Sequence, residues 1–327
     1  MRRRRLLWLA FAGLASSSFS MPGMGQRRLW RIGYHSGGSA DSNAGWLDSF
    51  RKGMAELGWS EARDYVIDAR YADGNQAANK RLAAELVATQ PDVILTTAEG
   101  SIFVLAGFTK TIPIVFALGA DPVGNRYVAS LQRPGGNLTG LTALTADLAA
   151  KRLELLKEAF PKTTHVLVLF EPTDPAAVSQ VRGLEAAAPR LNVRLTFLEV
   201  RQPADIDAAF QRSAKPAADA CMVVSGPLMN IQRKSIAARA IQLKMPSIAS
   251  NAIYADAGVL IAYAASAPAN FHRAAAYVDK ILKGAKPGDL AIEQPTKFTL
   301  TINAGTAKAL GATIPQSVML RADRVIE

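Results

Sequence analysis

Short apolar runs rich in β-branched residues alternate with helical periodicity along nearly the whole chain. The runs are candidate strands, and the segments between them are candidate amphipathic helices. Such alternation is typical of parallel sheets covered by helices. The candidate strands are residues 30–34, 66–71, 93–97, 114–118, 166–170, 195–200, 221–224 and 259–263. The pattern predicts an α/β protein with two successive sets of strands and helices.

The predicted helices have recognisable ends. One apolar helical face includes Leu47 and Leu57 and is followed by Gly58, and another runs from Phe271 to Leu282 and is followed by Gly284. Glycine adopts the left-handed conformation that often ends a helix. A third helix is predicted over residues 147–160, where it leads into the second set of strands.

Residues 121–142 are rich in Gly, Pro and Asn, which indicates sharp turns at a boundary between two lobes. With 49% hydrophobic residues, the chain is long enough to build a core in each lobe. We expect doubly wound parallel sheets in both lobes. The first lobe is expected to comprise residues 27–145 plus about 266–310, and the second residues 146–265 plus the C-terminal tail.

The first twenty residues have the features of a cleaved secretory signal. Four arginines, Arg2 to Arg5, precede an apolar run from Leu6 to Leu14 and then several small residues. The run is shorter than the roughly 20 residues that span a bilayer. We expect residues 1–20 to be removed on export to the periplasm. No cysteine lies in this segment to carry a lipid, and export by the Sec or the twin-Arg route stays open.

Charge and cysteine usage exclude some classes of protein. Loss of the four leader arginines lowers the formal charge from +11 to about +7, and the remaining basic residues are scattered among acids. The sequence has no dense basic stripe, so it gives no reason to expect nucleic acid as a partner. The single cysteine, Cys221, lies in an apolar run and cannot form an internal disulfide, so it is predicted to be a buried strand residue.

Polar residues follow the predicted strands. In open parallel α/β sheets, ligands bind beyond the carboxyl ends of the strands, and two such sheets facing one another form a cleft. The loops at these strand ends carry small, hydroxyl-bearing or acidic residues, which suit a small polar ligand. Taken alone, each loop is better explained as an ordinary turn or helix cap, because these structures require the same residues. The joint placement of the loops at the strand ends is what favours a ligand site.

Several stretches resemble the periplasmic substrate-binding proteins of ABC transporters, in the branch that includes tryptophan and tyrosine binders. The resemblance covers nearly all of the chain after the leader. Its most specific stretches are residues 50–58, 111–116, 121–140, 151–157, 277–287 and 293–298. It implies a type I binding-protein fold, with lobes joined by crossover strands and a ligand held between them. Hinge closure would present both lobes to a membrane permease.

The resemblance also implies where a ligand binds. We expect a monomeric solute receptor that binds an amino acid or related carboxylate and needs no metal or organic cofactor. The expected ligand-binding residues are placed by position, from the first lobe and then from the second: Ser36, Glu99, Gly100, Ser101, Asp121, Thr173, Ser225, Gly226, Asn251 and Tyr254.

Glu99 departs from the small hydroxyl residue expected in relatives. Facing the cleft, its carboxylate would favour a ligand with a cationic group, whereas pointing to water it would carry no information. Tyr34, Trp46, Tyr254 and Tyr263 are candidates to stack on an apolar ligand moiety. Of these, Trp46 also fits a helix core face, and Tyr254 is the preferred candidate.

The sequence offers little support for an enzyme. His35, His165 and His272 are far apart, and no zinc-protease, thiol-redox, nucleophile-elbow or phosphate-loop motif occurs. His35 alone is placed in a cleft loop. A repressor would need a helix-turn-helix before the sensory part, and only residues 21–28 separate the leader from the first strand. A ligand-sensing partner of a membrane sensor kinase remains an alternative to transport.

Overall fold

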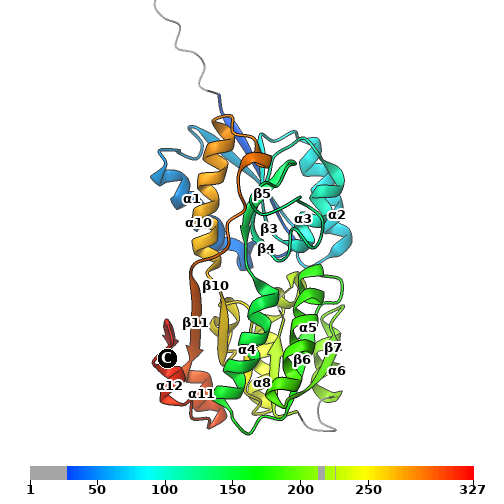
Figure 1. The fold of residues 1–327 in the computed structure, drawn as a ribbon, viewed down its shortest axis with the longest axis vertical. Helices are drawn as coiled ribbons and strands as arrows, with labels where there is room; N and C mark the ends of the chain where they lie inside the picture. Colours follow the sequence, from blue (N-terminus) through cyan, green and yellow to red (C-terminus); the bar gives the residue numbers. More distant parts are fainter. Residues whose placement is uncertain (1–27, 213–217, 225) are drawn as a thin grey trace, which may run out of the picture.

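Two helix-covered sheets lie one above the other in a computed structural model that describes residues 28–212, 218–224 and 226–327 (Figure 1). The first is a five-stranded parallel sheet. Its spatial order is β2 (Tyr65–Tyr71), β1 (Trp30–Ser36), β3 (Val93–Ala98), β4 (Ile114–Gly119) and β5 (Leu138–Thr142). This sheet forms the first lobe.

The second lobe contains a seven-stranded sheet that is parallel except for the antiparallel pair β10–β11. Its spatial order is β12 (Arg324–Ile326), β11 (Phe298–Asn303), β10 (Ile261–Ala265), β9 (Ser247–Ala249), β8 (Ala220–Val223), β6 (His165–Phe170) and β7 (Arg194–Glu199). The α/β architecture of two mainly parallel sheets is therefore as predicted.

Helices cover both faces of each sheet. The first lobe has α1 (Ala40–Glu56), α2 (Gln76–Ala88), α3 (Glu99–Phe108), α10 (Ala267–Leu282) and the 3-10 turn η2 (Pro287–Asp289). The second lobe has α4 (Thr145–Ala159), α5 (Pro175–Ala187), the 3-10 turn η1 (Ala188–Leu191), α6 (Ala204–Arg212), α7 (Pro227–Ile231), α8 (Arg233–Gln242), α9 (Ile253–Asp256), α11 (Ala304–Leu310) and α12 (Gln316–Met319).

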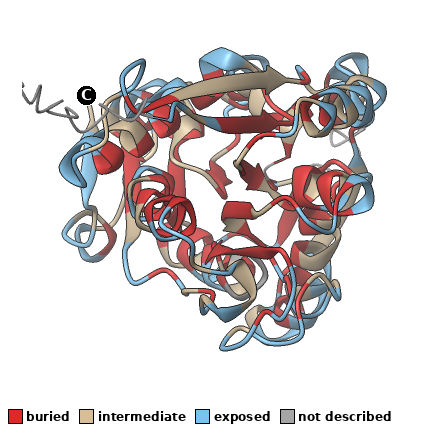
Figure 2. Ribbon diagram, turned by 90° about the horizontal axis from the view of Figure 1, so that it is seen from above, coloured by how far each residue is buried: buried red, intermediate tan, exposed pale blue. Residues whose placement is uncertain are grey.

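Alternate residues of each buried strand supply two separate cores. On β4, Val115 packs on the side of α1 and α10, whereas Ile114 and Phe116 pack on the side of α2 and α3. The second sheet repeats the arrangement with Val168 and Leu169 of β6. This follows from the two-residue period of strands. Figure 2 shows buried residues on the strands and inner helix faces, with exposed residues toward the outside.

The helix pair α1 and α10 encloses one face of the first sheet. Ser39 caps α1 by accepting a hydrogen bond from the backbone N–H of Ser42, and Gly58 beyond the helix has a φ of +86°. A Cβ atom at Gly53 would lie 2.5 Å from the carbonyl oxygen of His272 in α10. Glycine therefore allows these two helices, which are remote in sequence, to approach closely.

The chain passes between the lobes in three segments that contact one another. The first segment follows β5, the second follows β10, and the third precedes β11. Glu293 in the third segment donates its N–H to Gly140 and accepts from the N–H of Thr142, and Ser266 in the second donates to the carbonyl of Lys297. These three hydrogen-bonded crossover segments form the connection between the lobes.

Two features differ from the positions predicted from sequence. The Gly-rich segment expected to be a turning boundary ends in a buried strand, β5, where Gly140 has a φ of +145°. The return to the second lobe occurs before β11 begins at Phe298, earlier than the expected limit near residue 310, because β11 pairs with β10. The predicted leader, residues 1–20, lies outside the described residues.

Candidate functional site

A cavity lies between the two lobes, beside the crossover segments. Its volume is about 90 Å³, counted as the space open to the centre of a water molecule. The carboxyl end of β3 and the loops after β1, β6, β8 and β9 contribute to its walls, together with α1, α4 and α5. The site therefore occupies the place where the carboxyl ends of parallel strands in both lobes converge.

The structure brings part of the predicted residue set to this cavity. Ser36, Gly226 and Asn251 line it. Gly100 and Thr173 line a neighbouring hollow between the lobes, of about 360 Å³, which shares Asp174 and Pro227 with the cavity. The assignment of these residues as ligand contacts remains a prediction.

Ser101 does not line the cavity but holds one of the loops that do. Its Oγ accepts a hydrogen bond of 3.0 Å from the backbone N–H of Gly37, which fixes the loop after β1. Ser225, which was also predicted to contact ligand, lies outside the described residues.

Glu99 and Asp121 organise a loop instead of lining the cavity. The buried Glu99 carboxylate accepts hydrogen bonds from the Ala120 N–H at 2.7 Å and from Asn125 Nδ2 at 2.6 Å, and burial raises the pKa of this carboxyl. A buried carboxylate needs such donors, and these come from the loop after β4. Asp121 is exposed and accepts from the N–H of Gly124.

Tyr254 and His35 also lie in surroundings that differ from those expected. Tyr254 is completely buried in the core of the second lobe, with Cys221 and Val223. His35 belongs to β1 and not to a cleft loop. It is buried, its Nε2 lies 3.1 Å from the carbonyl oxygen of Asn79, and desolvation lowers its pKa to about 4. His35 is therefore neutral at physiological pH.

Asp174 lines the cavity although the sequence analysis did not select it. It caps α5, its Oδ1 accepts a 3.0 Å hydrogen bond from the N–H of Ala176, and its exposed fraction is 5%. Burial, and then the nearby charge of Glu171, raises the pKa of Asp174 to about 7. The Asp-Pro pair that begins α5 is the sequence signal for this cap.

Arg152 of α4 also lines the cavity and is 1% exposed. Its Nε donates to the carbonyl of Tyr263 at 2.8 Å, and its Nη1 donates to Oε1 of Gln180 at 2.9 Å. Its Nη2 is buried without a hydrogen-bond partner among the described residues. Burial lowers the pKa of Arg152 to about 9, so the guanidinium remains charged at neutral pH.

One wall of the cavity is apolar. Trp46 of α1 stacks on Phe271 of α10, with ring centroids 5.7 Å apart and planes inclined by 23°. The cavity is also lined by Leu118 and by several alanines, among them Ala143, Ala264, Ala265 and Ala267. Trp46 is thus both a core residue and a cavity residue. Small side chains in the same cavity as an indole leave room for a flat apolar group.

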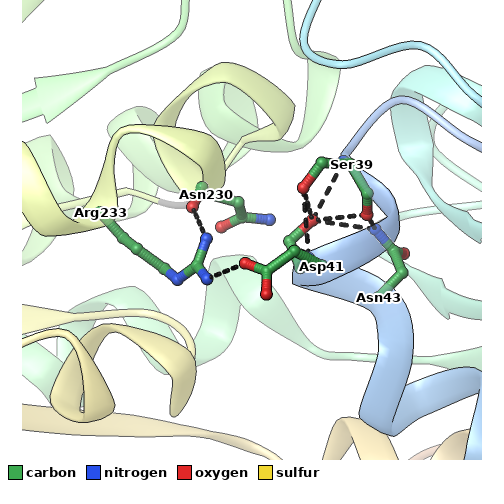
Figure 3. Close-up of polar contacts among 6 residues, drawn as sticks. Ser39, Asp41, Asn43, Asn230 and Arg233 are labelled. Carbon is green, nitrogen blue, oxygen red and sulfur yellow. Dashed lines mark hydrogen bonds and ion pairs between the residues drawn. The ribbon is translucent and has the colours of Figure 1, made fainter.

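Polar contacts join the lobes next to the cavity (Figure 3). Asp41 of α1 pairs with Arg233 of α8, whose Nη1 also donates to the carbonyl of Asn230 at 2.8 Å. Within the first lobe, Asn43 of α1 accepts hydrogen bonds from the hydroxyls of Tyr34 and Ser36. A Cβ atom at Gly37 would lie 3.0 Å from Cγ of Pro227. The two lobes are therefore in direct contact beside the cavity.

Within ranges 28–212, 218–224 and 226–327, no group of three or more His, Cys, Asp or Glu side chains is placed to hold a metal ion. No helix in these ranges is both long enough and apolar enough to cross a bilayer. Cys221 is a buried free thiol in β8, as predicted, and burial raises its pKa to about 12.

Known proteins share this fold and parts of this sequence. A curated tyrosine-binding protein from Clostridioides difficile (strain R20291) is 25% identical over 263 residues, which are 80% of this chain and 75% of that protein. A conserved domain protein from Vibrio cholerae is 28% identical with a TM-score of 0.86, covering 91% of this chain and 100% of the other. An ABC domain from Streptococcus pneumoniae in complex with L-Trp is 24% identical with a TM-score of 0.84, at the same coverage.

The sequence profile of the ABC transporter substrate binding proteins matches residues 39–326, almost the whole described chain. Proteins of this family bind small-molecule ligands, work with ABC permeases and are typically extracytoplasmic. The two-lobed fold and the cavity between the lobes agree with that match. This chain belongs to the ABC transporter substrate-binding protein family.

Proposed function

We propose that this protein is a periplasmic receptor that binds one amino acid with a large apolar or aromatic side chain and delivers it to an ABC permease. The cavity between the lobes carries the proposal, because its lining combines apolar side chains with the buried carboxyl group of Asp174. The tyrosine and L-Trp of the two relatives support the same class of ligand.

The ligand's ammonium group is assigned to Asp174. A bound cation next to a buried carboxylate compensates for the desolvation that otherwise raises the pKa of this group. The charge-assisted hydrogen bond would be stronger than one between neutral groups. Asp174 therefore takes the role that the sequence analysis gave to Glu99.

The ligand's side chain is assigned to the wall formed by Trp46 and the alanines. A ring that stacks on Trp46 would remove apolar surface from water on both partners. Binding between the lobes would favour the closed form, because only that form contacts the ligand from both sides. The proposal includes export of the chain, removal of residues 1–20 and the absence of catalysis.

Thermal unfolding of the leaderless protein, refolded to remove any co-purified ligand, tests the ligand class. The panel contains amino acids, aromatic carboxylates, short peptides, nucleosides and sugars. A ligand at 100 times its Kd stabilises the folded state by about 2.7 kcal/mol. We expect a saturable increase in Tm with aromatic amino acids, and Asp174→Asn should reduce it. Stabilisation by sugars or nucleosides alone would overturn the proposed class.

Uptake by intact cells tests delivery. A strain that lacks the protein should lose high-affinity uptake of the labelled ligand identified by the thermal assay, and the full-length gene should restore it. Unchanged uptake together with loss of a transcriptional response would instead support the sensor-kinase role.

A further inference from the structure

The buried, unpartnered Nη2 of Arg152 requires an explanation. We propose that Arg152 is the anion-binding residue of the cavity and that the ligand presents a carboxylate to Nη2, an inference that rests on the proposed function. Two of the three guanidinium nitrogens already have protein acceptors, the Tyr263 carbonyl and Gln180 Oε1. The third has none among the described residues and belongs to a side chain that lines the cavity.

The energetics favour an acceptor on the ligand. A buried N–H group of a charged side chain loses its hydrogen bonds to water and destabilises the protein unless another acceptor replaces them. A carboxylate supplies both a negative charge and lone pairs, and the guanidinium fork suits carboxylate geometry. A water molecule is the competing partner for Nη2, and a comparison of amino acids with their amides distinguishes it from a ligand carboxylate.

A chain of hydrogen bonds places Arg152 and Asp174 on the same wall. Arg152 Nη1 donates to Gln180 Oε1, Gln180 Nε2 donates to the carbonyl of Ala176 at 3.3 Å, and the N–H of Ala176 donates to Asp174. These residues belong to α4 and to the first turns of α5. The cavity thus has a cationic and an anionic pole in one lobe.

Two poles of opposite sign specify a zwitterion. A free amino acid carries an ammonium for Asp174 and a carboxylate for Arg152, whereas an amine, an amide or a sugar satisfies at most one pole. The side chain then extends toward Trp46. Gln180 acts as a positioning residue, because it contacts the guanidinium and holds its orientation without being required to touch the ligand.

The test compares ligands that differ only in the carboxylate. The probes are L-tryptophan and L-tyrosine, their amides, and the amines tryptamine and tyramine, each titrated by calorimetry against the leaderless protein. We expect the wild-type protein to prefer each amino acid over its amide by about 10- to 100-fold, the range for one charge-assisted hydrogen bond. Arg152→Gln should reduce this ratio to near one.

Controls separate recognition from folding. Arg182→Gln removes an exposed arginine from α5 and should leave the ratio unchanged. Arg152→Lys keeps a cation without the fork and should retain part of the preference, which matters if the glutamine variant unfolds. Gln180→Leu should lower the ratio less than Arg152→Gln does. Thermal unfolding of each unliganded variant monitors the fold.

The outcomes distinguish the two proposals. Binding of amino acids with an acid-to-amide ratio that persists in both Arg152 variants overturns the Arg152 assignment and leaves the proposed function intact; the water molecule is then the occupant. Indole-3-propionate, which keeps the carboxylate and lacks the ammonium, is a further probe. Failure of both amino acids, with tight binding of indole-3-propionate that depends on Arg152, overturns the amino-acid class and supports the anion site. Failure of every carboxylate overturns both.

Discussion

Asp41 Oδ2 accepts a hydrogen bond of 2.6 Å from Arg233 Nη2, which connects the start of α1 in the first lobe to the start of α8 in the second. Arg233 is largely buried in this contact, and Asp41 is mostly exposed. The hydrogen bond from Arg233 lowers the pKa of Asp41, which favours the charged form of this carboxylate. Because the partners belong to different lobes, this pair exists only while the lobes are together.

We predict that Asp41→Asn weakens ligand binding by a few-fold at most, because exposed ion pairs contribute little individually. The effect should appear mainly as faster ligand release and should shrink at high salt. Stopped-flow dissociation at two ionic strengths measures it. Asp207→Asn is the matched control, since it breaks an exposed pair with Arg239 inside the second lobe. Equal effects of the two substitutions would argue against a role in closure.

Asp174 makes the stability of the unliganded protein depend on pH. Its folded pKa of about 7 lies above the ordinary 3.8, so between these values the folded state binds more protons than the unfolded state. Its contribution to the free energy of unfolding therefore falls as pH rises through this window. Urea denaturation at pH 5 and pH 8 should show the trend, and Asp174→Asn should flatten it. An identical pH dependence in the variant would contradict this assignment.

Ligand binding should release a proton from Asp174. An ammonium group beside the carboxylate favours its ionised form, so binding near pH 6.5 displaces the proton held in the unliganded protein. Affinity should consequently fall as pH decreases below 7. Calorimetry in two buffers of different ionisation enthalpy counts the proton, and Asp174→Asn should abolish the difference between buffers. Net proton uptake would exclude an ammonium contact.

Trp46 should report binding by fluorescence. It lines the cavity, whereas Trp30 lies beside Arg28 and Trp59 donates to Asp279, both away from the cavity. Excitation at about 295 nm with L-phenylalanine or L-tyrosine as ligand should change the emission, since an aromatic ring would replace water near the indole. Trp46→Phe should remove the change and Trp30→Phe should keep it. The reverse pattern would place the ligand elsewhere.

Gly140→Ala should destabilise the first lobe. A Cβ atom there would lie 1.9 Å from the carbonyl oxygen of Phe116, and φ is +145°. Relieving this overlap requires the backbones of β4 and β5 to move apart, so we expect the free energy of unfolding to fall by about 3 kcal/mol or more. Gly136→Ala in the preceding loop meets no atom within 4 Å and should change stability by about 0.5 kcal/mol at most. Urea denaturation compares the two.

The fold could be predicted largely from local pattern. Short runs with β-branched and aromatic residues predicted β1 to β4, β6 to β8 and β10. The central strands of a covered parallel sheet are largely apolar, whereas β2 and β7, at the sheet edges, are partly exposed and carry charged residues. Four strands were missed, and each depends on its neighbours. β9 and β12 are only three residues long, β5 contains Gly140, and β11 (Phe298–Asn303) pairs antiparallel with β10. Their pairing depends on tertiary contacts, which local propensity does not encode.

The site was less predictable because burial between lobes is not visible in the sequence. Strand-end position selected Ser36, Gly226 and Asn251, which line the cavity, and their contact with a ligand stays a prediction. It did not distinguish Thr173 from Asp174, since adjacent loop residues point in different directions. Arg152 lies on a helix beside the apolar residues that α4 buries in its own lobe, so periodicity alone gave no reason to select it.

The packing of α1 against α10 sets an order for folding. The indole N–H of Trp59 donates to Asp279, a contact that spans 220 positions in sequence, and Phe50 and Phe271 share one core. A nascent chain cannot enclose this face of its first sheet until α10 has been synthesised. Proteins that depend on contacts between residues far apart in sequence fold more slowly than proteins with mainly local contacts. The first lobe therefore completes its core only after most of the second lobe has been made.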